Sequence, residues 1–136
     1  MISTYNSTTQ TVEVDGAYVF DTNRVATGCT VGHTPGTSTF TLNKPGYYYV
    51  TFNTTFTTAT TGVATVELRN GGIAVSGAIG AETVTTAGDT KSISFATIVR
   101  VLPSCPAIDN TVTLTFVATT LELDATAASV SITKLC

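Results

Sequence analysis

The sequence predicts an all-β fold: a single-domain antiparallel β-sandwich, or jelly roll, of eight to ten strands. Thr, Val and Ile account for 53 of the 136 residues, and such β-branched side chains lose rotamer freedom in a helix but fit a pleated sheet. Apolar and polar residues alternate in short segments between turn-forming residues, which is the pattern of half-buried strands. The length corresponds to one domain over residues 1–136.

The first third of the chain has short candidate strands between closely spaced turns. Residues 1–10 are a candidate extended N-terminal arm that precedes the first clear strand. Asp15-Gly16 and Thr34-Pro35-Gly36-Thr37 separate the segments that follow, because Gly, Pro and Asp favour a turn over a continuing strand. The strands expected here are residues 11–14, 17–20, 29–31 and 39–42.

The middle of the chain contains the longest apolar strand and the clearest hairpin. Pro45-Gly46 opens the long strand. Asn70-Gly71 lies between two apolar segments, and Asn-Gly readily adopts the positive φ angles of a tight hairpin turn. The strands expected here are residues 47–56, 63–69 and 73–75, and residues 78–88 are predicted as a loop or a weak strand.

The last third of the chain contains three further strands. The first of them stops at Pro103-Ser104-Cys105-Pro106. In the other two, apolar side chains alternate with Thr or Ser, so one face of each strand should be buried and the other exposed. The strands expected here are residues 92–102, 110–118 and 128–135.

Two strands are apolar on both faces. In residues 47–56, Tyr48 and Val50 share one face while Tyr47 and Tyr49 lie on the other, and residues 92–102 show the same arrangement. A strand that is apolar on both faces is normally buried on both, and in a two-layer sandwich only another chain or a loop can cover the second face. We expect another copy of the chain, with cover by a loop as the alternative. The candidate interface residues are Tyr47, Tyr49, Ile98 and Leu102.

Charge and chain ends limit the partners. Charged residues make up 11% of the chain, compared with roughly 25% in an average soluble protein, so either Thr solvates the surface or an assembly buries part of it. With a net charge of −3, the chain has no excess of basic residues that would indicate nucleic-acid binding. It also lacks a polybasic run that would indicate binding to an anionic membrane surface. The N-terminus lacks the regions of a signal peptide, which indicates an intracellular protein or one placed outside by another route, such as virion assembly.

No pattern in the sequence indicates a catalytic site or a cofactor. His33 is the single His and lies beside the Pro35-Gly36 turn, with no Asp or Cys near it in sequence. We expect a surface or turn residue rather than a ligand or base, although a triad assembled in space remains open. Phosphate-binding glycine loops and metalloprotease motifs are absent.

Metal binding has no clustered ligands in the sequence. The cysteines are odd in number and lack C-x-x-C spacing, so we expect reduced thiols rather than a metal site, with the last of them able to cross-link chains. The carboxylates are dispersed among turns, and a calcium site would need several loops to converge. The cysteines are Cys29, Cys105 and Cys136; the turn carboxylates are Asp15, Asp21, Asp89, Asp109 and Asp124.

Several segments together resemble the trimeric jelly-roll head domains of the tumour-necrosis-factor-like and complement type. The octapeptide Pro45-Gly46-Tyr47-Tyr48-Tyr49-Val50-Thr51-Phe52 is similar to the family's Pro-Gly-x-Tyr-x-Phe segment, and Val66-Glu67-Leu68-Arg69-Asn70-Gly71 resembles its central hairpin. Residues 128–135 resemble the last strand of bacterial and phage members, and residues 18–23 an early strand followed by Asn. The resemblance implies a ten-stranded jelly roll that forms a homotrimer, with the four candidate interface residues near the threefold axis.

The leading hypothesis for function is a non-enzymatic structural protein of a virus particle, assembled in the host cytoplasm. It would be a homotrimeric bacteriophage capsid-decoration protein or a head-fibre or tail component, and its partners would be other virion proteins such as the capsid lattice. The alternative is a receptor- or glycan-binding head domain of a phage fibre or of a bacterial spore or cell surface, in which Tyr47 and Tyr49 would stack on sugar rings. An enzyme is the least supported class.

Overall fold

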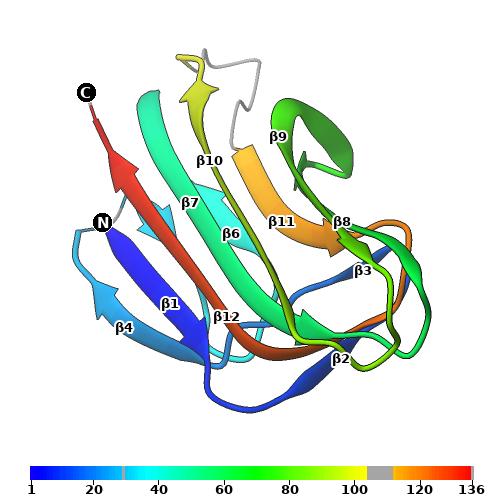
Figure 1. Cartoon of the computed structure of the whole chain (residues 1–136). Helices are drawn as coiled ribbons and strands as arrows, with labels where there is room; N and C mark the ends of the chain where they lie inside the picture. The colour runs from blue at the N-terminus through cyan, green and yellow to red at the C-terminus, as the bar shows by residue number, and fades with distance from the viewer. Residues whose placement is uncertain (29, 104–111, 136) are drawn as a thin grey trace.

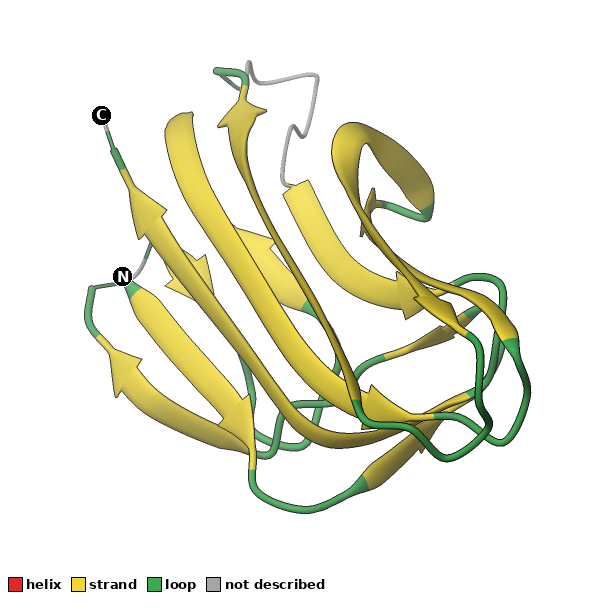
Figure 2. Cartoon of the chain, in the orientation of Figure 1, coloured by secondary structure: helices red, strands yellow, loops and turns green. Residues whose placement is uncertain are grey.

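A computed structural model shows the chain as a two-layer β-sandwich (Figure 1). The structure describes residues 1–28, 30–103 and 112–135. Within these residues it contains twelve strands and no helix, as Figure 2 shows, and accordingly none that could span a membrane. The predicted all-β antiparallel sandwich is confirmed. The two strands beyond the ten predicted are β1, Ile2–Asn6, and β4, Thr22–Ala26.

Sheet A is the layer that carries both ends of the chain. Its strands pair antiparallel in the order β10-β7-β12-β1-β4, with β2 also beside β12. The bounds are β1 Ile2–Asn6, β2 Gln10–Val12, β4 Thr22–Ala26, β7 Gly46–Thr57, β10 Lys91–Val101 and β12 Leu123–Lys134.

Sheet B is the second layer and faces sheet A across the core. Its order is β5-β6-β11-β8-β9, with β3 beside β11, and all its pairs are antiparallel. The bounds are β3 Gly16–Ala17, β5 Val31–Gly32, β6 Phe40–Leu42, β8 Gly62–Asn70, β9 Ile73–Val84 and β11 Val112–Ala118.

Aromatic rings join the two sheets at the centre of the core. Phe52 of β7 stacks on Phe116 of β11 with ring centroids 4.8 Å apart and an interplanar angle of 11°. Phe116 also meets the edges of Phe20 and Phe40 at 6.2 and 5.9 Å. All four rings have no measurable solvent exposure. Such pairs add about 0.5–1.5 kcal/mol each beyond their burial, so this cluster holds the layers in register.

A buried polar chain crosses the core beside these rings. Thr54 Oγ1 lies 2.9 Å from the Ala127 carbonyl oxygen and 3.2 Å from the Tyr18 hydroxyl oxygen. The Thr hydroxyl has one proton and the carbonyl can only accept, so Thr54 donates to Ala127 and accepts from Tyr18. Burial raises the pKa of Tyr18 to about 12. Ala127 follows the bulge between Ala125 and Ala127 in β12, and Thr54 thus fixes that irregularity.

The predicted hairpin and long strands are present, while several boundaries differ. Asn70 pairs with Ile73 around a turn in which Gly71 and Gly72 have φ of 59° and 87°. Of the two alternatives for residues 78–88, the strand is the one observed, because β9 continues to Val84. Its signal is weak because Gly77 and Gly80 replace side chains that would alternate.

The N-terminal third departs most from the prediction. Within the candidate arm, residues 1–10, residues 2–6 form β1 between β12 and β4, and β4 was not predicted. Residues 17–20 contribute only β3 and an isolated bridge from Phe20 to Thr37. The preceding strand ends at Val12, because residues 13–16 form a turn in which the Gly16 N–H donates to the Glu13 carbonyl oxygen at 2.8 Å and Asp15 has a φ of 63°. Cys29, Cys105, Cys136 and Asp109 lie outside the described residues.

A candidate interface on the outer face of sheet A

The predicted interface residues lie on the side of sheet A that faces away from the core. Tyr47 and Tyr49 are each 43% exposed, Ile98 is 57% exposed and Leu102 is 50% exposed. Tyr49 pairs with Ile98 across β7 and β10, and Leu102 follows directly after β10. The structure therefore brings these residues together, and no loop within the described residues covers them.

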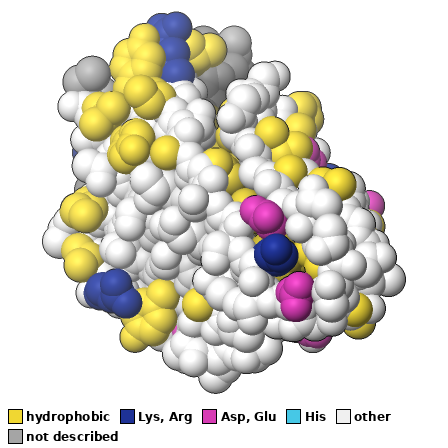
Figure 3. All heavy atoms as spheres, viewed as in Figure 1, with side chains coloured by type: hydrophobic (Ala, Val, Ile, Leu, Met, Phe, Trp, Pro, Cys, Tyr) yellow, Lys and Arg dark blue, Asp and Glu magenta, His cyan; other side chains and the backbone are white. Residues whose placement is uncertain are grey.

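Leu135 completes this group and was missed from the sequence. Its backbone N–H donates to the Tyr47 carbonyl oxygen at 2.7 Å, and its side chain is 53% exposed. Ser129, Ser131, Thr133 and Leu135 alternate onto one face, so an apolar residue at the end of that series was an available signal. We refer to the five residues Tyr47, Tyr49, Ile98, Leu102 and Leu135 as the apolar cluster. Figure 3 shows hydrophobic side chains gathered at the upper end of this face.

Arg100 lies within the apolar cluster. It pairs with Tyr47 across the strands, and its guanidinium carbon lies 5.7 Å from the centre of the Tyr47 ring. This is a cation–π arrangement, which keeps a charge at an apolar surface at low cost. Arg100 makes no ion pair with any carboxylate that the structure describes.

Small uncharged side chains make up the centre of this face. Thr51 is flanked by Ala96 and Ser131, and the next outward residue of β7, Asn53, is flanked by Ser94 and Ser129. The centre of the face in Figure 3 accordingly carries neither charged nor hydrophobic side chains. Free protein surfaces usually mix both signs of charge. Short side chains without charge instead suit a face that another molecule approaches closely.

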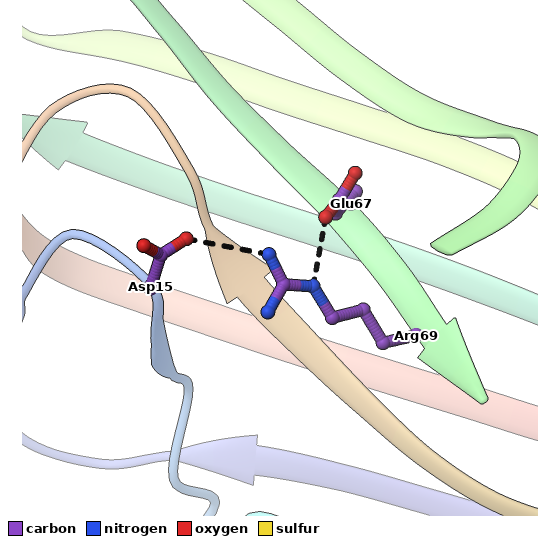
Figure 4. A network of polar contacts seen from close by, with 3 residues as sticks. All are labelled: Asp15, Glu67 and Arg69. Atoms are coloured by element: carbon purple, nitrogen blue, oxygen red, sulfur yellow. Dashed lines mark hydrogen bonds and ion pairs between the residues drawn. The ribbon is translucent and has the colours of Figure 1, made fainter. Parts of the chain in front are cut away.

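The outer side of sheet B carries a network of ion pairs. Arg69 Nε donates to Glu67 at 2.8 Å and Arg69 Nη2 donates to Asp15 at 3.3 Å (Figure 4). The hydrogen bond to Glu67 is the main cause that raises the pKa of Arg69, and Asp15 adds to it. The network ties the turn before β3 to β8, and it is a structural element of a solvated surface.

His33 is held within a loop rather than at a reactive centre. Its ring stacks on Phe40 with centroids 4.5 Å apart. Nδ1 lies 2.6 Å from Asn23 Oδ1, and Nε2 lies 3.0 Å from the Thr37 carbonyl oxygen. Burial is the main influence on the imidazole and lowers the pKa of His33.

The turn carboxylates that the structure describes, Asp15, Asp21, Asp89 and Asp124, do not converge on a cation site. Asp21 accepts hydrogen bonds from Ser7 and Thr22, while Asp124 accepts from Thr11. Over the ranges that the structure describes, no three His, Cys, Asp or Glu side chains are grouped to hold a metal ion.

Comparison with solved structures identifies the fold. The TNF protein Eiger from S. frugiperda matches with a TM-score of 0.69 and 13% identity over 99% of this chain and 92% of that chain. Murine APRIL matches at 0.60 and 9%, covering 98% and 97% of the two chains. The PRD1 vertex protein P5 matches at 0.58 and 14%, covering 99% and 96%. No protein-family model and no curated protein matches significantly. The expected tumour-necrosis-factor-like jelly-roll fold is confirmed.

Proposed function

We propose that this tumour-necrosis-factor-like jelly roll is a non-enzymatic, homotrimeric structural protein of a virus particle. The apolar cluster is the observation that carries the proposal, because it exposes two tyrosines and three aliphatic side chains on one face. A trimer would bury this face between copies. The fold shared with the PRD1 phage vertex protein P5 supports a role in a phage particle.

The outer face of sheet A supports cover by another copy of the chain. Fully burying one exposed aliphatic or aromatic side chain contributes about 1.5–3 kcal/mol. The members of the apolar cluster are already about half buried, so burying the remainder of each contributes roughly half of that. The small polar side chains around Thr51 and Asn53 allow a neighbour to approach without burying charge. Tyr and Arg, here Tyr47, Tyr49 and Arg100, are also the types enriched at the centres of interfaces.

The contacts of the titratable groups support a structural role rather than catalysis. His33 is occupied by the Asn23 amide and the Thr37 carbonyl, and Arg69 by two carboxylates. Within the particle, the trimer would act mechanically, by packing against a capsid lattice or as a head-fibre or tail component. Its location would then be the virion.

Light scattering tests the trimer directly. We expect a mass three times the 14.1 kDa of one chain. Replacing Tyr47→Ser and Tyr49→Ser together should dissociate it, because the central rings of the interface are lost. The control pair Val63→Ser and Ile73→Ser removes apolar side chains that are 49% and 75% exposed elsewhere and should leave the trimer intact. A wild-type monomer, or a Tyr47/Tyr49 variant that stays trimeric, would contradict the proposal.

Binding experiments test the virion role separately from the trimer. The wild-type trimer should bind purified capsids and should not bind a glycan array through Tyr47 and Tyr49. If the wild type bound the array, and the double serine variant remained a trimer but lost that binding, the glycan-binding alternative for these tyrosines would replace the proposal.

A further inference from the structure

The outer side of sheet B is hollowed at the edge formed by β5 and β6. The hollow has a volume of about 540 Å³, which lies within the range of about 300–1,000 Å³ for ligand pockets. The proposed trimer buries the outer face of sheet A, whereas this hollow opens on the other layer, at the edge opposite β9. It is therefore separate from the apolar cluster. The lining residues used below are Gly32, His33, Thr37, Thr39, Thr41 and Asn43.

β6 and the residues beside it form the floor of the hollow. Phe40 and Leu42 point into the core and have no measurable solvent exposure. The residues that alternate with them, Thr39, Thr41 and Asn43, therefore lie on the outer side. Thr39 and Thr41 are half-buried, and their hydroxyl groups make no hydrogen bond to any residue that the structure describes. Two hydroxyl groups in a hollow thus keep their donors and acceptors for a ligand.

Gly32 provides the space between these side chains. It pairs with Thr41, and residues directly opposite each other in an antiparallel pair face the same side of the sheet. Gly32 does not have a positive φ, and a Cβ added there would lie 3.7 Å from Asn43 Nδ2, which is an ordinary contact. The backbone at this position would therefore accept a side chain, and the effect of the glycine is to leave the hollow open.

The wall of the hollow is a loop that its own hydrogen bonds hold in place. The Thr37 N–H and the Thr37 hydroxyl both donate to the Thr34 carbonyl oxygen, at 3.1 and 2.7 Å. Phe40 covers one face of the His33 ring. The ring nitrogens lie against Asn23 and Thr37, so the opposite face of the imidazole is the part that remains for a ligand. A wall that is ordered before binding loses less conformational entropy when a ligand enters.

We propose that this hollow binds a neutral hexose unit of a glycan. Thr39 and Thr41 hydrogen-bond to sugar hydroxyl groups, and the open face of the His33 ring packs against the C–H face of the sugar. None of the described residues that line the hollow is Asp, Glu, Lys or Arg, so an acidic sugar or a phosphate would lose water without gaining a counter-charge. An apolar ligand fits less well, because it would cover hydroxyl and amide groups without hydrogen-bonding to them.

Titration followed by NMR and calorimetry tests the site on the wild-type protein. The neutral probes are D-glucose and D-galactose, and their acidic counterparts are sodium D-glucuronate and sodium D-galacturonate. At least one neutral sugar should bind saturably and about tenfold or more tightly than its acidic counterpart, which corresponds to about 1.4 kcal/mol. The largest chemical-shift changes should be those of the amides of residues 32–41.

Two substitutions test the hollow in different ways. Gly32→Val should abolish saturable binding, because the new side chain fills the space and Val is well accepted in a strand. Thr41→Val keeps the shape and removes one hydroxyl group, so it should weaken binding about two- to tenfold, which corresponds to about 0.5–1.5 kcal/mol. Thr113→Val is the matched control, since Thr113 pairs with Thr41 from β11 but does not line the hollow. It should bind as the wild type does.

The site is refuted if neither neutral sugar binds saturably, or if neutral and acidic sugars bind equally well. Unchanged binding in Gly32→Val or Thr41→Val, or an equal loss in Thr113→Val, also refutes it. Binding seen only with the dissociated Tyr47/Tyr49 variant does the same, because the hollow would then be covered in the trimer. The molecular mass and Tm of each variant are measured in parallel. A trimer that binds no sugar refutes the site alone, whereas a wild-type monomer that binds a neutral hexose refutes the trimer alone.

Discussion

Thr54 is the side chain on which the buried polar chain depends. Thr54→Val removes the donor to the Ala127 carbonyl and the acceptor of the Tyr18 hydroxyl together. A buried polar group left without a partner costs about 1–3 kcal/mol, so the free energy of unfolding in urea should fall by at least that amount. Tyr18→Phe removes only the phenol oxygen and leaves Thr54 bound to Ala127. Tyr18→Phe should lower the free energy of unfolding by no more than about 0.5–1.5 kcal/mol. A loss equal to or larger than that of Thr54→Val would refute this account.

Asp21 should make stability depend on pH at the acid end. Its carboxylate accepts from the Ser7 hydroxyl at 2.5 Å, the Ser7 N–H at 3.0 Å and the Thr22 hydroxyl at 2.9 Å. These bonds, the Ser7 hydroxyl first, lower the pKa of Asp21 from 3.8. Because the folded pKa is the lower one, the stabilisation is complete above the unfolded pKa and is lost as pH falls through the folded pKa.

The measurement is Tm as a function of pH for the wild type and Asp21→Asn. The wild type should melt at a higher temperature near neutral pH, and the difference should shrink once the pH falls below about 4. Asp89→Asn is the control, because the Asp89 side chain makes no hydrogen bond to any residue that the structure describes. A difference that stayed constant down to about pH 2 would show that the carboxylate charge is not responsible.

At the residue scale, the sequence predicted which side chains of a strand face outward, because this depends on local alternation. Tyr47, Tyr49 and Ile98 face outward because neighbouring residues of a strand point to opposite faces. The contact between Arg24 and Tyr5, in which the guanidinium carbon lies 4.7 Å from the ring centre, was not predicted, because it joins two different strands. Tyr5 and Arg24 lie on β1 and β4, whose sequences alternate too weakly to be recognised as strands. Their cation–π contact exists only once β1 and β4 pair.

At the element scale, β9 depends on the absence of a side chain at Gly80. A Cβ added there would collide with Ile93 Cγ2 and lie 3.3 Å from Phe95 Cδ1. Gly80→Ala should therefore destabilise the protein by about 1–3 kcal/mol in urea unfolding. Gly32→Ala is the control, since the nearest atom, Asn43 Nδ2, would be 3.7 Å away, and it should change stability by less than about 0.5 kcal/mol.

A double-mutant cycle assigns the Gly80 effect to its cause. Ile93→Ala removes the colliding methyl group, so Gly80→Ala with Ile93→Ala should cost less than the two single changes added together. Contacting residues show interaction energies of about 0.5–3 kcal/mol in such cycles. Strict additivity would mean that the two strands do not meet at this point.

Elements with strong alternation were predictable, and elements defined by their neighbours were not. β7 and β10 have long apolar series and were found almost in full, and Asn70-Gly71 located the β8–β9 hairpin. β9 itself was underestimated, because its small residues suit a close approach to β10 that no local pattern reveals. β12 begins at Leu123, earlier than expected, because the bulge between Ala125 and Ala127 breaks the alternation there.

At the scale of the whole molecule, the charged side chains are arranged differently on the two faces of the sandwich. The chain has only 6 basic and 9 acidic residues. On the outer side of sheet B, Arg69 forms ion pairs with Glu67 and Asp15, whereas on sheet A Arg24 and Arg100 each lie over a tyrosine ring. Composition alone did not identify this difference in arrangement.

The strand order of sheet A has a consequence for how the protein is made. β12, the last strand in the sequence, lies between β7 and β1, and Ile2 pairs with Ile132. Until β12 leaves the ribosome, β10 and β7 have no strand to connect them to β1 and β4. Strand β1 must therefore wait for β12, because its main partner lies far along the chain from it. Such contacts between distant parts of a chain slow folding. Until β12 is available the incomplete sheet exposes its unpaired edges, which makes the arrival of β12, rather than the formation of β1, the step that completes sheet A.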